Sequence, residues 1–271
     1  NVIQFVTTLA QVLALALAAW LLLEASEFVF LLGVAQLLTA GLLLIVILKF
    51  RKVSWRFDFG LLRRISGFSF RAYCVTLLGF LVSRAGVVLL DDFSGKAEIG
   101  IYSVALQFND ALIIIPASVS LVLFPKLVSE SSVLGFDYVL KTATYLSILM
   151  AALCGVLAYL AFWVVPLLYG QEFSAAVPML WLMLPGVIAI SFSNVISQYL
   201  AVKGIPLGNI WAWLCGFIIL MCASVYSIPQ WGGMGAAASL SLTYIFVAVT
   251  LFALAVKKNQ THKPYKSEAR I

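Results

Sequence analysis

Residues 67–90 read GFSFRAYCVTLLGFLVSRAGVVLL, residues 91–98 read DDFSGKAE and residues 99–124 read IGIYSVALQFNDALIIIPASVSLVLF. Each outer segment contains about the 20 apolar residues that an α-helix needs to cross a bilayer core. Three charged residues, Arg71, Arg84 and Asp110, lie well inside them. Because a charge inside a bilayer costs at least about 2.5 kcal/mol, it usually faces a cavity or a partner. We therefore expect functional residues in this helical hairpin, Gly67–Lys126.

The composition of the whole chain agrees with this interpretation. Of its 271 residues, 63% are hydrophobic and 10% are charged, whereas soluble domains average roughly 25% charged residues. The apolar runs are continuous rather than alternating, which excludes a membrane β-barrel. We predict an all-α polytopic membrane protein. Because the chain starts at Asn1, immediately before an apolar run, we also expect it to be a fragment that has lost earlier helices.

Apolar runs of sufficient length occur eight times along the chain. The predicted spans are Val2–Leu23, Phe28–Leu48, Gly67–Leu90, Ile99–Phe124, Tyr138–Val165, Ala175–Val202, Pro206–Ile228 and Gly235–Val256. With this count, all basic residues except Arg71, Arg84 and Lys96 fall on one side of the membrane. Cytoplasmic loops carry such an excess of Lys and Arg. We therefore expect both ends of the chain to be cytoplasmic; the family resemblance described below implies a bacterial inner membrane.

The largest loop on the basic side, Lys49–Ser66, interleaves bases with Trp55, Phe57 and Phe59. Such a segment is typical of the interface beneath anionic headgroups. Nucleic-acid binding is the alternative for a basic aromatic patch, but a position beside the bilayer does not favour it. We therefore expect membrane lipids, and no nucleic acid, as partners here.

The first span of the hairpin has one polar stripe. At 100° per residue, Tyr73, Thr76 and Arg84 share a narrow face of the helix. Arg71 lies about 160° from Tyr73 and close to the basic boundary, so we interpret it as an interface anchor that reaches the headgroups. Arg84 lies about 10 Å from the opposite boundary. We predict that Arg84 is a cation facing a cavity.

The second span of the hairpin is polar on two faces. Gln107 and Asp110 lie on one face, while Tyr102, Asn109 and Ser120 lie on the opposite one. We expect such a helix to lie between a cavity and another helix. Asp110 could pair with Arg84, carry a proton or sodium ion, or shape the electric field of the cavity.

Other polar groups either extend this candidate site or have ordinary explanations. A stripe in the sixth span contains Asn194 and Gln198, which could contact a ligand or form hydrogen bonds between helices. The four cysteines all lie in apolar spans without a CxxC pair, and the single histidine is His262. We therefore predict free thiols, no metal site, no cofactor and no catalytic constellation. The candidate cavity residues are Tyr73, Thr76, Arg84, Gln107, Asp110, Asn194 and Gln198.

Several motifs in and after the hairpin resemble one family of transporters. They are FDFGLLRRISGFSF (57–70), SRAG (83–86), EIGIYSVALQFNDALIIIPASVSLVLFPKLVSE (98–130), LLYGQEFSAAVPMLWLMLPG (167–186), SQYLAVKGIPLGN (197–209) and WGGMGAAASLSLTYIF (231–246). In this order they resemble the polysaccharide (O-antigen) flippases of the multidrug/oligosaccharidyl-lipid/polysaccharide exporter superfamily. The resemblance extends over about residues 50–256.

The resemblance implies a two-lobed transporter whose cationic central cavity alternates between the two leaflets. Its substrate would be a polyprenyl-pyrophosphate-linked oligosaccharide, as in lipopolysaccharide assembly, and glycan-assembly membrane proteins would be possible partners. Residues 1–48 would be the last two helices of the first lobe and residues 49–66 a basic cytoplasmic linker. Residues 67–256 would form a complete six-helix second lobe, and residues 257–271 a basic cytoplasmic tail.

The chain departs from the family pattern at Gly86, where many relatives have an aspartate two positions after the arginine. This departure puts in doubt an ion-pair or coupling role at that position. The same superfamily offers an alternative function, a multidrug cation antiporter, but such a protein would need an acidic cavity. A membrane-embedded glycan-processing enzyme would need external histidines or carboxylates, and a scaffold would not need charges inside its spans.

Overall fold

The computed structural model describes residues 9, 12–13, 25–50, 59–129 and 135–261. Most of the predicted first span, the middle of the Lys49–Ser66 loop and most of the C-terminal tail lie outside these ranges. The chain divides into two compact units, residues 1–61 and residues 62–271. The boundary between these units falls inside the loop that we predicted to be a linker.

Every described element is helical, as the composition predicted. The first unit contains α2 (Ala25–Phe50), and α3 (Phe59–Phe93) begins at its end. The second unit contains the rest of α3, then α4 (Lys96–Ser129), α5 (Phe136–Tyr169), the short 3₁₀ helix η1 (Gln171–Phe173), α6 (Ala176–Val202) and α7 (Leu207–Thr261). Five described helices, α3 to α7, are long and apolar enough to cross a membrane. The protein therefore has the helices of a multi-pass membrane protein.

Several helices are longer than the predicted spans. α3 begins at Phe59 rather than Gly67 and continues to Phe93, because the residues flanking its apolar core also have helical backbone geometry. The predicted loop Asp91–Glu98 therefore shrinks to a turn at Ser94 and Gly95. Apolar content marks the part of a helix that lies in a membrane, but it does not mark where the helix ends.

The longest helix, α7, is folded back on itself at Gly232. This residue has φ 53° and ψ −133°, which are not helical values, and a positive φ suits glycine. The two arms run antiparallel, since Gly208 lies against Leu254 and Gly216 lies against Val247. Each arm is longer than the roughly 20 residues that cross a bilayer. The arms correspond to the two predicted spans Pro206–Ile228 and Gly235–Val256.

In the second unit, α6 is the central helix and packs closely against α4, α5 and α7. Glycines make the close contact with α7 possible, since a Cβ atom on Gly186 would lie 2.7 Å from Ser241 Cα. Large side chains such as Leu180, Met183, Ile196 and Leu200 are fully buried around α6. This core holds α4 against α6, and the candidate site residues lie on α3, α4 and α6.

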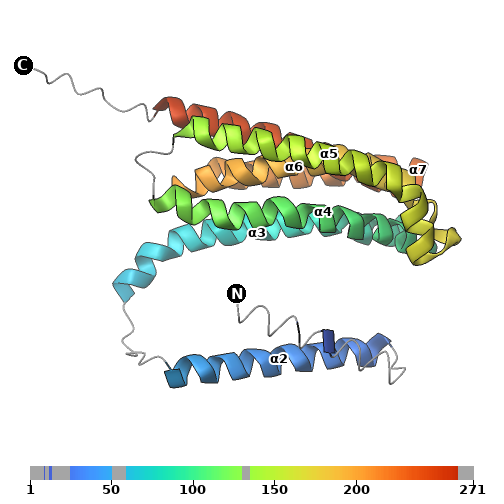
Figure 1. The fold of residues 1–271 in the computed structure, drawn as a ribbon, viewed down its shortest axis with the longest axis horizontal. Helices are drawn as coiled ribbons and strands as arrows, with labels where there is room; N and C mark the ends of the chain where they lie inside the picture. Colours follow the sequence, from blue (N-terminus) through green and yellow to red (C-terminus); the bar gives the residue numbers. More distant parts are fainter. Residues whose placement is uncertain (1–8, 10–11, 14–24, 51–58, 130–134, 262–271) are drawn as a thin grey trace, which may run out of the picture. The chain divides into compact units, whose positions relative to one another are not determined.

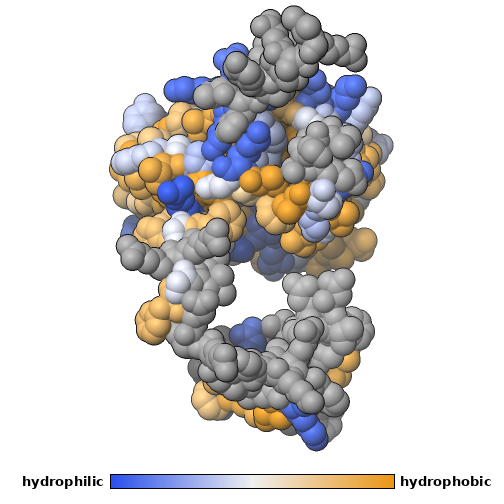
Figure 2. Space-filling model, turned by 90° about the vertical axis from the view of Figure 1, so that its left-hand side faces the viewer, coloured by the Kyte–Doolittle hydropathy of each residue, from blue (hydrophilic) through white to orange (hydrophobic). Residues whose placement is uncertain are grey.

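The helices of the second unit alternate in direction, so that their turns gather at two opposite ends (Figure 1). At one end, Lys258 Nζ donates to the Lys203 backbone oxygen at 3.1 Å and Lys126 Nζ donates to the Tyr138 hydroxyl at 3.2 Å. Figure 2 looks onto this end and shows hydrophilic surface interrupting the apolar surface of the helices. We call it the basic end, and it matches the predicted segregation of Lys and Arg.

The opposite end is closed by the turns between α3 and α4, between α5 and α6, and within α7. Here the Gly233 backbone N–H donates to Glu98 Oε1 at 2.8 Å. Gly233 begins the second arm of α7, so the Glu98 carboxylate satisfies an N–H group at a helix N-terminus, where negative charge is favoured. A Cβ on Gly232 would lie 2.5 Å from the same carboxylate oxygen. The WGGMG motif therefore allows a tight turn to approach α4.

Candidate functional site

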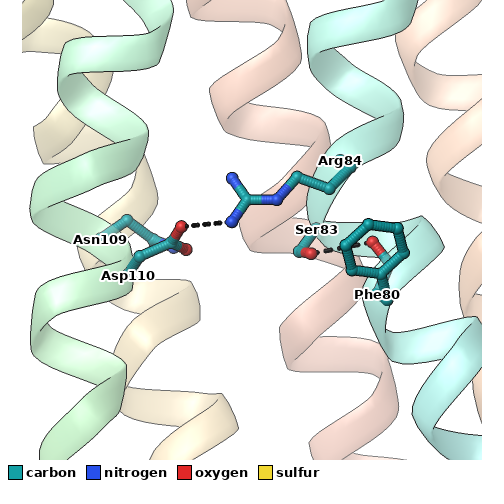
Figure 3. Close-up of polar contacts among 5 residues, drawn as sticks. All are labelled: Phe80, Ser83, Arg84, Asn109 and Asp110. Carbon is teal, nitrogen blue, oxygen red and sulfur yellow. Dashed lines mark hydrogen bonds and ion pairs between the residues drawn. The ribbon is translucent and has the colours of Figure 1, made fainter. Parts of the chain in front are cut away.

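Arg84 of α3 and Asp110 of α4 form an ion pair. Arg84 Nη2 lies 2.8 Å from Asp110 Oδ2, and the side chains are 47% and 36% exposed. Figure 3 shows the two side chains pointing toward each other across the space between the helices. Pairing with Arg84 was one of the three alternatives that the sequence left open for Asp110. The pair uses only Nη2, so other N–H groups of the guanidinium fork are available to a ligand.

The predicted stripe on α3 is an exposed face of the second unit. Tyr73 is 63% exposed, and Thr76 and Arg84 are exposed as well. The Thr76 hydroxyl donates to the Ala72 backbone oxygen at 3.0 Å, a local bond within the helix. Tyr73, Thr76 and Arg84 thus lie on the open side of α3, as the helical periodicity predicted.

The opposite side of α3 contacts α4 through Gly86, which is buried against Tyr102. A Cβ atom on Gly86 would lie 2.6 Å from the Tyr102 hydroxyl oxygen. Tyr102 is 1% exposed, so it has little room to move aside. An aspartate at position 86 would therefore collide with this ring. No pattern in the sequence indicated that Tyr102 contacts position 86.

The two polar faces of α4 have different surroundings, as predicted. Tyr102, Asn109 and Ser120 are buried, whereas Gln107 is exposed. Asn109 Nδ2 donates to Asp110 Oδ1 at 3.4 Å, and Asn109 Oδ1 is buried without a hydrogen-bond partner. Asp110 is thus held by Asn109 on its own helix and by Arg84 on α3. The adjacency of Asn109 and Asp110 in the sequence was the available signal for this contact.

Gln107 is linked to the α5–α6 turn. The Tyr169 hydroxyl donates to Gln107 Oε1 at 2.7 Å, and the Tyr169 ring packs edge-on against Phe108 at 6.2 Å between centroids. Tyr169 and Phe173 belong to the YGQEF part of a motif found in the sequence, and their rings lie 6.0 Å apart. The motif therefore anchors the end of α5 on α4 and positions the amide of Gln107.

The remaining predicted cavity residues, Asn194 and Gln198, lie on α6. Both side chains are half-buried. Ser191, three residues before Asn194 on the same helix, donates to the Val187 backbone oxygen at 2.6 Å. The described contacts do not connect Asn194 or Gln198 to the Arg84–Asp110 pair. Their assignment to the cavity therefore stays a prediction.

Arg71 lies at the basic end of α3, in agreement with its predicted position near a boundary. Its Nη1 donates to the Ile205 backbone oxygen at 3.4 Å. Ile205 has φ 46° in the turn between α6 and α7, an unusual conformation for a β-branched residue. Arg71 thus contacts a protein turn, while its predicted role as an anchor to headgroups stays a prediction.

Metal-ligating side chains and thiols are scattered over the described part of the chain. Within the described residues, no three His, Cys, Asp or Glu side chains are grouped so that they could hold a metal ion. Cys74, Cys154, Cys215 and Cys222 are free. His262 lies outside the described residues. Within the described spans, Arg84 and Asp110 form an ion pair at 2.8 Å.

Comparison with models of protein families identifies a family for this chain. A family model described as "Polysaccharide biosynthesis protein" matches residues 1–178, which is well over half of the chain. The match includes residues 1–49, before the motifs quoted above, and it ends in α6, so the two last motifs lie beyond it. Neither a curated protein nor a solved structure matches the chain.

Proposed function

The chain belongs to the polysaccharide biosynthesis protein family, and we propose that it is a flippase for polyprenyl-pyrophosphate-linked oligosaccharides. It would move this substrate from the inner to the outer leaflet of a bacterial cytoplasmic membrane by alternating access. In this proposal, residues 62–261 contain the second lobe, and the basic end faces the cytoplasm. The first lobe would include α2.

The observation that carries this proposal is the placement of Arg84. A lipid-facing arginine at the centre of a span costs about 2.5–3.5 kcal/mol on insertion scales, yet Arg84 lies on an open face of α3. Its ion pair with Asp110 connects that face to the polar face of α4. An aqueous cavity between two lobes would give both side chains a polar environment, and this favours a transporter over a membrane anchor.

The substrate chemistry fits this site. A pyrophosphate offers several anionic oxygens, and a guanidinium binds such oxygens through a planar fork of N–H groups. Arg84 would exchange its contact with Asp110 for the pyrophosphate, so Asp110 would hold the arginine in place between transport cycles. Gln107, Tyr73 and Thr76 would offer hydrogen bonds to sugar hydroxyls. The lobes would then rock about this site to expose it to the other leaflet.

The exchange of one partner for another has an energetic advantage. Because both side chains are partly exposed, an unpaired Arg84 would stay partly solvated, and losing Asp110 would cost the empty transporter no more than about 1 kcal/mol. Asp110 avoids this cost when no substrate is bound. Because the pair is partly exposed, its own strength is modest, and a doubly charged pyrophosphate can compete for the arginine.

We propose that the protein transports its substrate without covalent catalysis. Coupling to a proton or sodium gradient is not part of this proposal. The alternative in the same superfamily, a multidrug cation antiporter, would use a carboxylate to bind its substrate. In the described helices Asp110 is engaged by Arg84 and Asn109, which makes it a poor receptor for an organic cation. A glycan flippase is therefore the function that we favour.

The test is export of surface glycan by cells whose only copy of the full-length protein carries Arg84→Ala. We expect export to fall at least tenfold while the amount of protein in the membrane stays within twofold of the wild type. Arg84→Lys should recover part of the export, because it keeps the charge but loses the fork. Normal surface glycan in the Arg84→Ala strain would refute the proposed role.

Arg71→Ala provides the matched control, since it removes an arginine from the same helix. Arg71 lies at the basic end, away from the Arg84–Asp110 pair, so we expect export within about twofold of the wild type. If both substitutions reduce export equally, the effect would come from the net charge of α3. The same strains should show unchanged resistance to cationic drugs, and a loss of resistance would favour the antiporter.

A further inference from the structure

A groove of about 510 Å³ lies between α4 and α5 toward the basic end. Its wall contains the apolar side chains of Val119, Val122 and Leu123, all from α4. Lys126 and Tyr138 line it where α4 ends and α5 begins. The groove thus combines an apolar wall with a polar, positively charged mouth at one end.

The mouth of the groove is organised by a contact between its two polar residues. Lys126 Nζ donates to the Tyr138 hydroxyl at 3.2 Å and lies 5.2 Å from the centre of the Tyr138 ring. The ring holds the ammonium at the mouth through a cation–π interaction. An ammonium has three N–H donors and the phenol has one O–H. Together they can donate hydrogen bonds to the oxygens of a phosphate group.

The mouth of the groove lies away from the face of α4 that carries Asp110. Lys126 is 16 residues after Asp110, which places it about 160° from Asp110 around the axis of α4. Val122, between them in the sequence, is 75% exposed. This side of α4 is therefore exposed in the second unit and turned away from the Arg84–Asp110 pair.

The length of the groove matches one leaflet of a bilayer. From Ser118 to Lys126, α4 advances about 12 Å at 1.5 Å per residue. Half of a hydrocarbon core of about 30 Å is about 15 Å. A lipid whose phosphate lies at Lys126 can therefore lay most of one acyl chain along Val119, Val122 and Leu123.

We propose that this groove binds one anionic phospholipid of the leaflet at the basic end. Its phosphate contacts Lys126 and Tyr138, and one acyl chain lies along α4. Positive charge at a cytoplasmic boundary attracts the anionic lipids of that leaflet, so the charge of the mouth suits a phosphatidylglycerol headgroup better than a zwitterionic one. The proposal shares with the proposed function only the orientation of the basic end, and it requires no transport.

The experiment measures lipid retention by the purified full-length protein in detergent, using native mass spectrometry. Phosphatidylglycerol and phosphatidylethanolamine with identical acyl chains are added in equal amounts. We expect the wild type to retain phosphatidylglycerol at least fivefold better, and Lys126→Ala to remove most of this preference. Lys141→Ala is the matched control, because Lys141 is exposed on α5 and does not line the groove. Its preference should stay within twofold of the wild type.

A second variant, Val122→Trp, fills the groove and leaves both polar residues in place. We expect it to reduce retention of phosphatidylglycerol several-fold while the melting temperature stays near that of the wild type. Unchanged retention in this variant would show that the acyl chain does not occupy the groove. Equal losses in Lys126→Ala and Lys141→Ala would show that surface charge alone attracts the lipid.

Competition identifies other occupants of the groove. Inorganic phosphate at the same concentration should not displace the lipid, and displacement would reveal a site for a free anion. Displacement by a polyprenyl pyrophosphate would assign the groove to the transport substrate and overturn the proposal. Because retention is measured without transport, failure here is distinguishable from failure of the proposed function, which the Arg84→Ala export assay tests.

Discussion

α3 and α6 are both long apolar helices of the second unit, but they have different surroundings. In their most apolar windows, 61% of the residues of α6 are buried and only 22% of the residues of α3 are. α6 packs against three other helices, whereas α3 contacts its neighbours at a few points such as Gly86 and Arg84. The difference separates the helix that organises the fold from the helix that carries the candidate chemistry.

This contrast explains why similar polar residues have different roles on the two helices. Ser191 on α6 is fully buried and donates to its own helix. Arg84 on α3 is half exposed and reaches a second helix. A polar residue on a closely packed helix is satisfied inside the bundle, while one on an open face is available to a ligand. Substitutions on α6 should therefore affect stability, and substitutions on the open face of α3 should affect export.

The largest expected effect on stability comes from adding one methyl group to Gly186 of α6. A Cβ there would lie 2.7 Å from Ser241 Cα, so backbone must shift, and overpacking typically costs about 1–3 kcal/mol. Gly79→Ala on α3 is the control, since its Cβ would make an ordinary 3.6 Å contact with the Trp213 ring. We expect thermal or denaturant unfolding in detergent to show Gly186→Ala less stable by about 2 kcal/mol. Equal stabilities of the Gly186→Ala and Gly79→Ala variants would contradict the difference in packing between α6 and α3.

A smaller loss is expected from Gly86→Ala, where α3 meets the buried Tyr102. The added Cβ would lie 2.6 Å from the Tyr102 hydroxyl, so we expect a loss of about 1 kcal/mol. Adding Tyr102→Phe removes the hydroxyl and should recover part of that loss. The two single variants and the double variant form a thermodynamic cycle that is measured by unfolding. Strict additivity would show that these residues do not touch.

The smallest effects on stability come from the hydroxyl groups of Ser191 and Thr76. Each donates to a backbone oxygen of its own helix, and removing such a bond costs about 1 kcal/mol when it is buried and less when it is exposed. We expect Thr76→Ala to change stability by less than about 0.5 kcal/mol but to reduce glycan export. Ser191→Ala should reduce stability more and export less. If Thr76→Ala mainly reduced stability and Ser191→Ala mainly reduced export, α6 and not α3 would carry the functional residues.

The sequence predicted the helical class and the segregation of basic residues because both depend on composition and spacing. It also placed Tyr73, Thr76 and Arg84 on one face of α3, since helical periodicity alone decides that. Its errors concern helix ends: the loop predicted at Asp91–Glu98 is largely helical. Polarity changes at the edge of a membrane, whereas a helix ends where its backbone hydrogen bonds end.

Contacts between distant residues could not be predicted in the same way. The contacts of Gly86 with Tyr102 and of Glu98 with Gly233 depend on how closely two helices approach. That approach is set by the packing of the whole bundle, which no local pattern contains. Arg84 and Asp110 were easier to connect, because a charge inside an apolar span needs a partner and few partners were present.

The most direct test of the central claim exchanges the two charges, with Arg84→Asp and Asp110→Arg in one protein. The exchange keeps an ion pair between α3 and α4, so we expect a melting temperature near that of the wild type. It also moves the guanidinium from α3 to α4, so its fork no longer meets the pyrophosphate from the same side. We predict that glycan export stays at least tenfold below the wild type. Full recovery of export would show that the pair holds the two helices together and that Arg84 does not bind the substrate.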